Sequence, residues 1–169
     1  RLAASPSGRA RLFRFLSQLG IRYTESPVVA EDLSDASAEF RRGPAKGARA
    51  PDGPLHLPRQ GFASLFSRLT GPRHHLLLFA GPSSSTLLAF EAYKRRLVTE
   101  QGALYRLHVI LGRDAVDFEP QGVDVCIDST GLLHSRYGIT RSGLYLVRPD
   151  GYIAYRSATL NVVVTEHTD

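Results

Sequence analysis

The sequence contains little of several residue types on which protein chemistry depends. Its 169 residues include no methionine, no tryptophan and a single cysteine, Cys126. One cysteine excludes an internal disulfide and a Cys-x-x-Cys pair. The surrounding Val123-Asp124-Val125-Cys126-Ile127 segment predicts an apolar strand, so we interpret Cys126 as a buried, inert thiol.

Long hydrophobic runs are also missing. The longest, Leu76 to Ala80, is far shorter than the roughly 20 residues that a membrane-spanning helix needs. The start, Arg1-Leu2-Ala3-Ala4, has neither an initiator methionine nor the apolar stretch of a secretory signal. We therefore expect no membrane association, a cytoplasmic location, and an N-terminus that was cut or processed.

Lysine is scarce, although the formal net charge is +5. Only Lys46 and Lys94 are lysines, so arginine carries most of the positive charge. The basic residues form small, separate clusters: Arg9/Arg11/Arg14, Arg41/Arg42 and Lys94/Arg95/Arg96. Because no zinc-finger spacing and no strand with interleaved aromatic residues accompanies them, we expect no nucleic-acid partner. The charge is interpreted as a solvated surface, or as a surface that faces an acidic partner.

Metal-ligand spacing is missing as well. The histidines are dispersed, and the one adjacent pair, His74-His75, would point to opposite faces of a strand. The sequence has no His-x-His and no His-Glu-x-x-His pattern, so it predicts no metal site. An acidic loop with Asp114, Asp117 and Glu119 is interpreted as solvated, with an ion site as the alternative.

The apolar pattern that is present predicts alternating helices and strands. Helices are expected over 9–19, 62–69, 86–101 and 129–137, and strands over 75–79, 105–111 and 123–127. An extended segment is expected over 21–29, and 159–169 is compatible with a strand or a helix. The polar segment 31–53 is expected to be an ordered arm or a long loop outside the core. This order is typical of an α/β fold.

The stretch from Gly143 to Arg156 predicts a β-hairpin. Apolar and polar residues alternate on both sides of Arg148-Pro149-Asp150-Gly151. Proline presets φ at the first turn position, aspartate can bond the backbone two residues on, and glycine accepts a positive φ.

The order of motifs resembles the C-terminal thioredoxin-like domain of FAD-dependent aromatic-ring hydroxylases, the phenol hydroxylase and polyketide hydroxylase group. The motifs are Arg49-Ala50-Pro51-Asp52, Tyr137-Gly138, Leu146-Val147-Arg148-Pro149-Asp150-Gly151 and Ile153-Ala154-Tyr155-Arg156. The resemblance covers roughly residues 20–157. Tyr155 departs from it, because the family usually has tryptophan there.

The resemblance implies a thioredoxin-like mixed sheet with flanking helices over 61–169, preceded by an N-terminal helix and extended arm over 1–60 that packs on the core. It also implies a chain without catalysis of its own, joined to FAD and substrate domains of an NAD(P)H-using monooxygenase and able to add homodimer contacts. No Gly-x-Gly-x-x-Gly motif follows a strand, so FAD and NAD(P)H are expected only in that parent protein. The alternative is a free-standing, redox-inactive interaction module.

Thiol chemistry is not expected at the positions that carry it in thioredoxins. Gly81-Pro82-Ser83-Ser84 stands where thioredoxins have Cys-x-x-Cys, and Arg141-Ser142-Gly143 lacks the cis-proline that precedes their first hairpin strand. The Ser83-Ser84-Ser85-Thr86 run is interpreted as capping the helix that follows, with anion binding as the alternative. Ser84 has no identifiable base that would make it a nucleophile. We therefore predict no catalytic, cofactor-binding or metal-binding residue in this chain.

Overall fold

The computed structural model describes residues 30–80, 104–113 and 123–159. Within these ranges the chain forms strands and two short helices. The strands are β1 (Ala30–Asp32), β2 (Pro54–Leu57), β3 (Gly61–Ser64), β4 (His74–Ala80), β5 (Tyr105–Gly112), β6 (Asp124–Asp128), β7 (Gly143–Val147) and β8 (Ile153–Ser157). The helices are α2 (Ala38–Arg42) and α4 (Leu132–Arg136).

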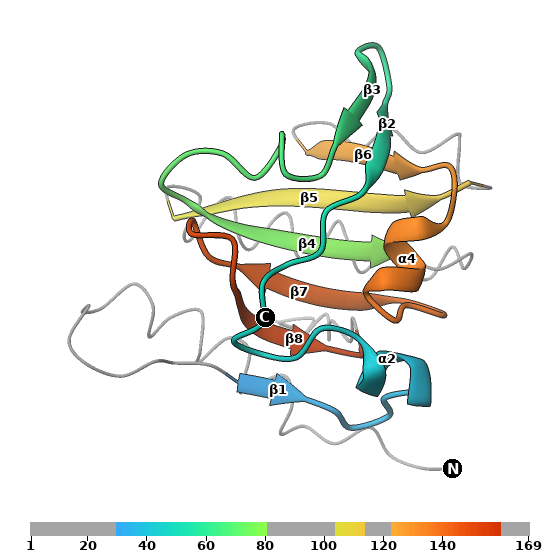
Figure 1. Cartoon of the computed structure of the whole chain (residues 1–169), viewed down its shortest axis with the longest axis vertical. Helices are drawn as coiled ribbons and strands as arrows, with labels where there is room; N and C mark the ends of the chain where they lie inside the picture. Colours follow the sequence, from blue (N-terminus) through green and yellow to red (C-terminus); the bar gives the residue numbers. More distant parts are fainter. Residues whose placement is uncertain (1–29, 81–103, 114–122, 160–169) are drawn as a thin grey trace, which may run out of the picture.

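One mixed sheet contains all of these strands, in the order β1-β8-β7-β4-β5-β6-β2-β3. β4, β5 and β6 run parallel, whereas β7 is antiparallel to both β4 and β8. β4 and β5 lie at the centre, and α4 lies near their carboxyl ends (Figure 1). The predicted α/β class with a mixed sheet is confirmed.

β4 contains the apolar run Leu76 to Ala80, and it is buried from His75 to Ala80. Parallel strands with both faces covered need such a continuous apolar run, because neither face meets water. The predicted strands over 75–79, 105–111 and 123–127 are confirmed as β4, β5 and β6, with every bound within one residue of the expected one.

The predicted hairpin is confirmed as β7 and β8. Gly151 has φ of 85°, and its N–H donates to the Arg148 carbonyl at 2.9 Å. Asp150 Oδ1 accepts from the Tyr152 N–H two residues on, at 3.2 Å. Each turn residue therefore plays the part that its chemistry predicts.

The helix predicted over 62–69 is wrong. Residues 61–64 form β3, which pairs antiparallel with β2 along its whole length. The following residues form successive turns, in which the Arg68 N–H donates to the Leu65 carbonyl and the Leu69 N–H to the Phe66 carbonyl. An isolated helix of this length is marginal, and pairing with β2 satisfies the backbone groups of 61–64 directly.

The polar segment 31–53 is ordered, but the expectation that it lies outside the core is wrong. β1 pairs parallel with β8, and Ser37 caps α2 by accepting from the Phe40 N–H at 3.1 Å. Phe40 and Ala50 are each only 2% exposed. Two apolar side chains thus anchor a segment whose average composition is polar. β1 and β2 belong to the same sheet as the later strands. The division of the chain into an arm over 1–60 and a domain over 61–169 stays a prediction.

The helix predicted over 129–137 is present in shortened form as α4. Its start is delayed because Asp128-Ser129-Thr130-Gly131 forms a turn, in which Gly131 has φ of 71°. The helices predicted over 9–19 and 86–101, the extended segment 21–29 and residues 160–169 lie outside the described residues.

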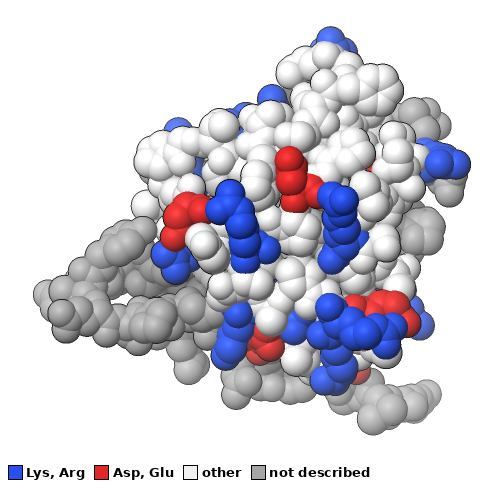
Figure 2. Space-filling view, viewed as in Figure 1, with Lys and Arg blue, Asp and Glu red and all other residues white. Residues whose placement is uncertain are grey.

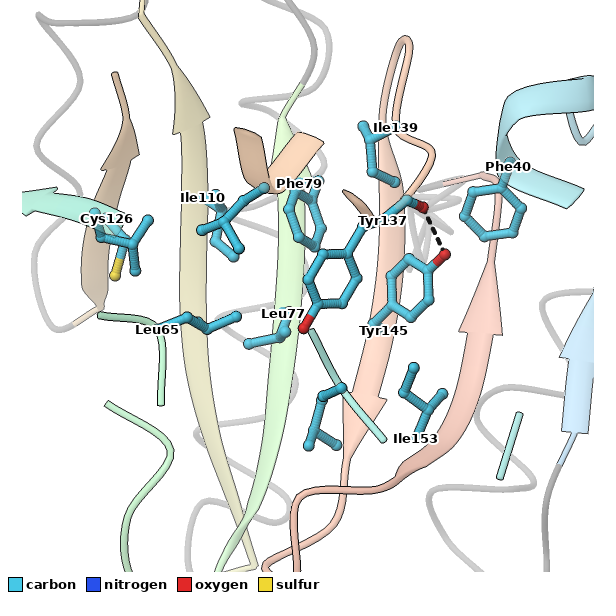
Figure 3. Close-up of a cluster of buried hydrophobic side chains, with 14 of the residues drawn as sticks. Phe40, Leu65, Leu77, Phe79, Ile110, Cys126, Tyr137, Ile139, Tyr145 and Ile153 are labelled. Carbon is cyan, nitrogen blue, oxygen red and sulfur yellow. Dashed lines mark hydrogen bonds between the residues drawn. The ribbon is translucent and has the colours of Figure 1, made fainter. Parts of the chain in front are cut away.

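The core on one face of the sheet contains a group of aromatic side chains (Figure 3). The rings of Tyr137 and Tyr145 meet edge to face with centroids 4.9 Å apart, and Phe79 lies 4.9 Å from Tyr137. The Tyr145 hydroxyl donates to the Tyr137 carbonyl at 2.7 Å. This bond lets a buried hydroxyl contribute to an otherwise apolar cluster.

Candidate functional site

Parallel α/β sheets usually bind ligands beyond the carboxyl ends of their strands. β4 ends at Ala80, and the Gly81-Pro82-Ser83-Ser84 turn that follows it lies outside the described residues, as does Thr86. Arg141-Ser142-Gly143 is described, and no cis peptide bond occurs within the described ranges.

An aspartate–histidine pair lies at this end of the sheet. Asp128 is fully buried and accepts from both the backbone N–H and the ring Nδ1 of His134, each at 2.8 Å. His134 Nε2 lies 3.4 Å from the Ala80 carbonyl oxygen. Burial alone would raise the pKa of Asp128, but the bonds from His134 outweigh it and lower that pKa. The two bonds to Asp128 fasten α4 to β6, and the His134 ring lies against the end of β4.

Cys126 lies on β6 and is fully buried. Burial raises the pKa of its thiol to about 12. Because the thiolate is the reactive form, we expect this cysteine to be chemically inert at neutral pH. The structure therefore confirms that Cys126 is buried, as its apolar surroundings predicted, and its inertness stays a prediction.

A second polar group crosses the opposite end of the same three parallel strands. His75 on β4 and His108 on β5 are completely buried, and His75 Nδ1 lies 3.0 Å from His108 Nε2. His108 Nδ1 in turn lies 3.1 Å from Asp124 Oδ2 on β6. We call His75, His108 and Asp124 the histidine row.

Two arginines hold the acidic end of the histidine row. Arg68 donates to both carboxylate oxygens of Asp124, at 2.7 and 2.8 Å from the same terminal nitrogen, and Arg106 lies 3.3 Å away. Burial would raise the pKa of Asp124, but His108 and Arg68 outweigh it and lower that pKa to about 2. Asp124 is therefore a carboxylate at any physiological pH.

A third group of contacts joins the segment before β2 to the motifs of the hairpin. The chain between α2 and β2 passes in front of β7, β4 and β5 (Figure 1). The Tyr137 hydroxyl donates to the Pro51 carbonyl at 2.9 Å, and Arg136 donates to the Asp52 carbonyl. The Ala50 N–H donates to the Gly151 carbonyl at 2.9 Å. The Ile153 N–H donates to the Ala48 carbonyl at 2.9 Å. We call these contacts, the Tyr145–Tyr137 bond described above and the contacts of the next two paragraphs the joint.

Two glycines allow the backbones of the joint to touch. A Cβ at Gly138 would lie 2.3 Å from the Glu39 carbonyl oxygen, and one at Gly43 would lie 2.6 Å from the Tyr137 carbonyl oxygen. Gly138 also has φ of 68°, a conformation that favours glycine. No larger residue fits at either contact without a backbone shift.

Arg156 closes the joint from β8. It is 3% exposed, and its guanidinium donates to Glu31 and to the Phe40 and Gly43 carbonyls, each at 3.0 Å. It also lies over the Phe40 ring, 5.3 Å from the centroid. A planar guanidinium can satisfy a carboxylate and two carbonyls at once, which a lysine cannot.

The motifs noted in the sequence therefore meet in space, and they do so as structural contacts. The prediction that this chain has no catalytic, cofactor-binding or metal-binding residue stays a prediction. Within the described ranges, no group of three or more His, Cys, Asp and Glu is arranged to hold a metal ion. The acidic loop with Asp114, Asp117 and Glu119 lies outside those ranges.

The histidine row was missed in the sequence. The signal was present, because His75 directly precedes the apolar run of one predicted strand and His108 interrupts the apolar run of another. A buried polar side chain needs a polar partner, and the next strand is the nearest place to find one. The side chains of His74 and His75 were expected on opposite faces of the strand, and their contacts agree with this: the His74 ring contacts the Tyr105 ring, and the His75 ring contacts the His108 ring.

Surface charges of both signs are mixed on the face seen in Figure 2. Exposed ion pairs within the described residues include Arg42 with Glu39 and Arg148 with Asp150. The expectation of no nucleic-acid partner stays a prediction. No helix in the described part of the chain is long and apolar enough to cross a membrane.

Solved structures similar to this chain share a thioredoxin-like fold. A thiol peroxidase from Chromobacterium violaceum matches with a TM-score of 0.53 and 17% identity, over 68% of this chain and 76% of that one. The thioredoxin domain of a thiol-disulfide oxidoreductase from Bacteroides vulgatus matches with a TM-score of 0.54 and 14% identity, over 66% and 87%. A thioredoxin-like protein from Bacteroides caccae matches with a TM-score of 0.55 and 16% identity, over 72% and 48%.

Comparisons of the sequence itself add no family. No protein-family model matches the chain, and no curated protein matches it. The structural matches are below 25% identity, so they establish the fold alone. The predicted thioredoxin-like α/β fold is thereby confirmed.

Proposed function

We propose that this chain is a redox-inactive, thioredoxin-like C-terminal domain of an FAD-dependent aromatic hydroxylase of the phenol hydroxylase type. Its role there is structural: it packs on the flavin and substrate domains and adds subunit contacts. FAD and NAD(P)H belong to the parent protein, and no residue of this chain is assigned to them.

The observation that carries the proposal is the joint. The motifs that resemble the hydroxylase domain are far apart in sequence, yet Pro51 bonds Tyr137, Ala50 bonds Gly151, and Arg156 bonds the carbonyls of Phe40 and Gly43. A set of motifs that builds one internal contact is expected of a domain retained for its shape. Thiol chemistry receives no support, because the single cysteine of the chain is buried with a raised pKa.

The first experiment uses the chain as it stands. Purified protein should show no flavin absorbance, no NAD(P)H oxidation with phenols, and no disulfide reductase activity towards insulin with dithiothreitol. A Cys126→Ala variant is the matched control and should give the same traces. Stoichiometric bound FAD would contradict the accessory role, and cysteine-dependent insulin reduction would contradict redox inactivity.

The second experiment separates the proposal from its alternative, a free-standing interaction module. The gene is sequenced upstream of the codon for Arg1. An in-frame FAD domain with a Gly-x-Gly-x-x-Gly motif supports the hydroxylase parent. A start codon immediately upstream, with no such domain, supports the free-standing module instead.

A further inference from the structure

The histidine row has a defined direction of hydrogen bonding. Asp124 is a carboxylate and can only accept, so the nitrogen facing it, His108 Nδ1, carries a proton. In the neutral imidazole His108 Nε2 is then a lone pair, and His75 Nδ1 must donate to it across 3.0 Å. His75 Nε2 is left as a buried lone pair, and it has no hydrogen-bond partner within the described residues.

One added proton changes the end of this row whichever ring formally carries it. The facing nitrogens of His75 and His108 can share only one proton, and the nitrogen facing Asp124 already has one. The third proton of a singly protonated pair therefore lies on His75 Nε2. A completely buried N–H then has no acceptor among the described residues, which is an unfavourable state.

Adding two protons to the His75–His108 pair is more unfavourable than adding one. Both facing nitrogens would then carry hydrogen, and the bond between the rings would be lost. The His108 Nδ1 contact with Asp124 is already off the line of a well-formed hydrogen bond, so it compensates only in part.

The charged groups around the pair oppose protonation more than they favour it. Arg106, on β5, lies near both His75 and His108, and Arg68 approaches His108 from the turn after β3. Asp124 on β6 is the acidic partner, and its charge is already shared with both arginines. His74, the adjacent residue of β4, adds to the opposition, and β7 places the uncharged Val147 opposite His75.

We propose that the histidine row is an acid-sensitive device: uptake of one proton by the His75–His108 pair loosens the amino-terminal end of β4 and β5. This goes beyond the structural role proposed above and is independent of it. Water must reach His75 Nε2 to accept the new N–H, so the sheet opens locally at that end.

The test measures unfolding by urea at pH 7 and at pH 4.5. The variant is His75→Leu with His108→Leu, which removes the titrating pair while keeping bulk, and the control is Phe62→Leu, at a side chain that is 83% exposed and outside the histidine row. Between the two pH values the unfolding constant of the wild type should rise at least about tenfold more than that of the double variant. The control should follow the wild type. Equal pH dependence in wild type and double variant would overturn the proposal.

A measurement on the wild-type chain covers the case in which the double variant fails to fold. Nitrogen-15 NMR of the imidazoles at pH 7 should show protonated Nδ1 and unprotonated Nε2 in both His75 and His108. On acidification both rings should stay neutral until well below pH 6.5, the ordinary pKa of a histidine. A pair that titrates near pH 6.5, or that shows protonated Nε2 at pH 7, would overturn the proposal.

Discussion

The joint and the histidine row are both buried and both polar, but they differ in how completely their polar atoms are paired. In the joint, the hydroxyls of Tyr137 and Tyr145 and the guanidinium of Arg156 all have hydrogen-bond partners. In the histidine row, one nitrogen of each histidine has no well-formed hydrogen bond within the described residues. The joint is therefore fixed at any ordinary pH, whereas the histidine row can respond to acid.

The difference shows which parts of this fold carry structure and which can carry a response. The residues that resemble a family motif lie in the fixed region, so the motif describes a scaffold. The residues that no motif marked lie in the responsive region. A motif search directed at active sites would have found neither the structural role of the joint nor the histidine row.

The largest expected effect comes from breaking the joint at its closest backbone contact. Gly138→Ala places a Cβ 2.3 Å from the Glu39 carbonyl oxygen at a positive φ, and should cost about 3 to 5 kcal/mol of unfolding free energy. Gly61→Ala is the matched control: its φ is also positive, at 83°, but nothing lies within 4 Å. It should cost about 1 kcal/mol. Equal losses in urea denaturation would mean that the close approach does not matter.

The next largest effect is the acid dependence of the histidine row. Burial lowers the pKa of His75 to about 4, and the neighbouring charges of His108 and Arg106 act in the same direction. The unfolded chain therefore binds a proton before the folded chain does. Stability is complete above pH 6.5 and falls by about 3 kcal/mol as the pH drops to about 4.

Hydrogen exchange can localise that loss. Protection factors, corrected for intrinsic rates, should fall at pH 4.5 for the amides of 74–77 and 105–108. Those of Ala50 and Ile153, which bond within the joint, should change less. A uniform fall across both regions would contradict a local opening.

A smaller effect is expected from one hydroxyl of the joint. Tyr145→Phe removes the bond to the Tyr137 carbonyl and should cost about 1 kcal/mol, because a buried acceptor loses its donor. Tyr152→Phe, at a side chain 40% exposed, should leave the unfolding free energy almost unchanged. Thermal denaturation at pH 7.5 distinguishes the two variants. Similar losses of stability in both would mean that the Tyr145 hydrogen bond contributes little.

The sequence predicted those parts of the fold in which local chemistry and tertiary structure agree. β4 contains an apolar run and is buried, and Asp150 and Gly151 form the turn that their residue types predict. The segment 62–69 was mispredicted because its apolar spacing suits a helix, whereas the backbone of β3 forms hydrogen bonds with β2. The role of Phe40 could not be predicted from a polar neighbourhood, since its burial depends on the distant Arg156 and Tyr145.

The candidate sites were predictable only in part. The burial of Cys126 follows from its apolar neighbours, and the structure agrees. The histidine row depends on the register of β4, β5 and β6, which places His108 opposite Asp124 and diagonal to His75. Register between distant strands is a tertiary property, so no local pattern contains it.

The measurement that tests the central claim most directly is the flavin content of the protein encoded by the complete reading frame. We predict stoichiometric FAD in that protein, and also in a variant that lacks residues 30–159, with the deletion weakening subunit association and thermal stability. A complete protein without flavin, or one whose flavin is held by this chain alone, would contradict the account.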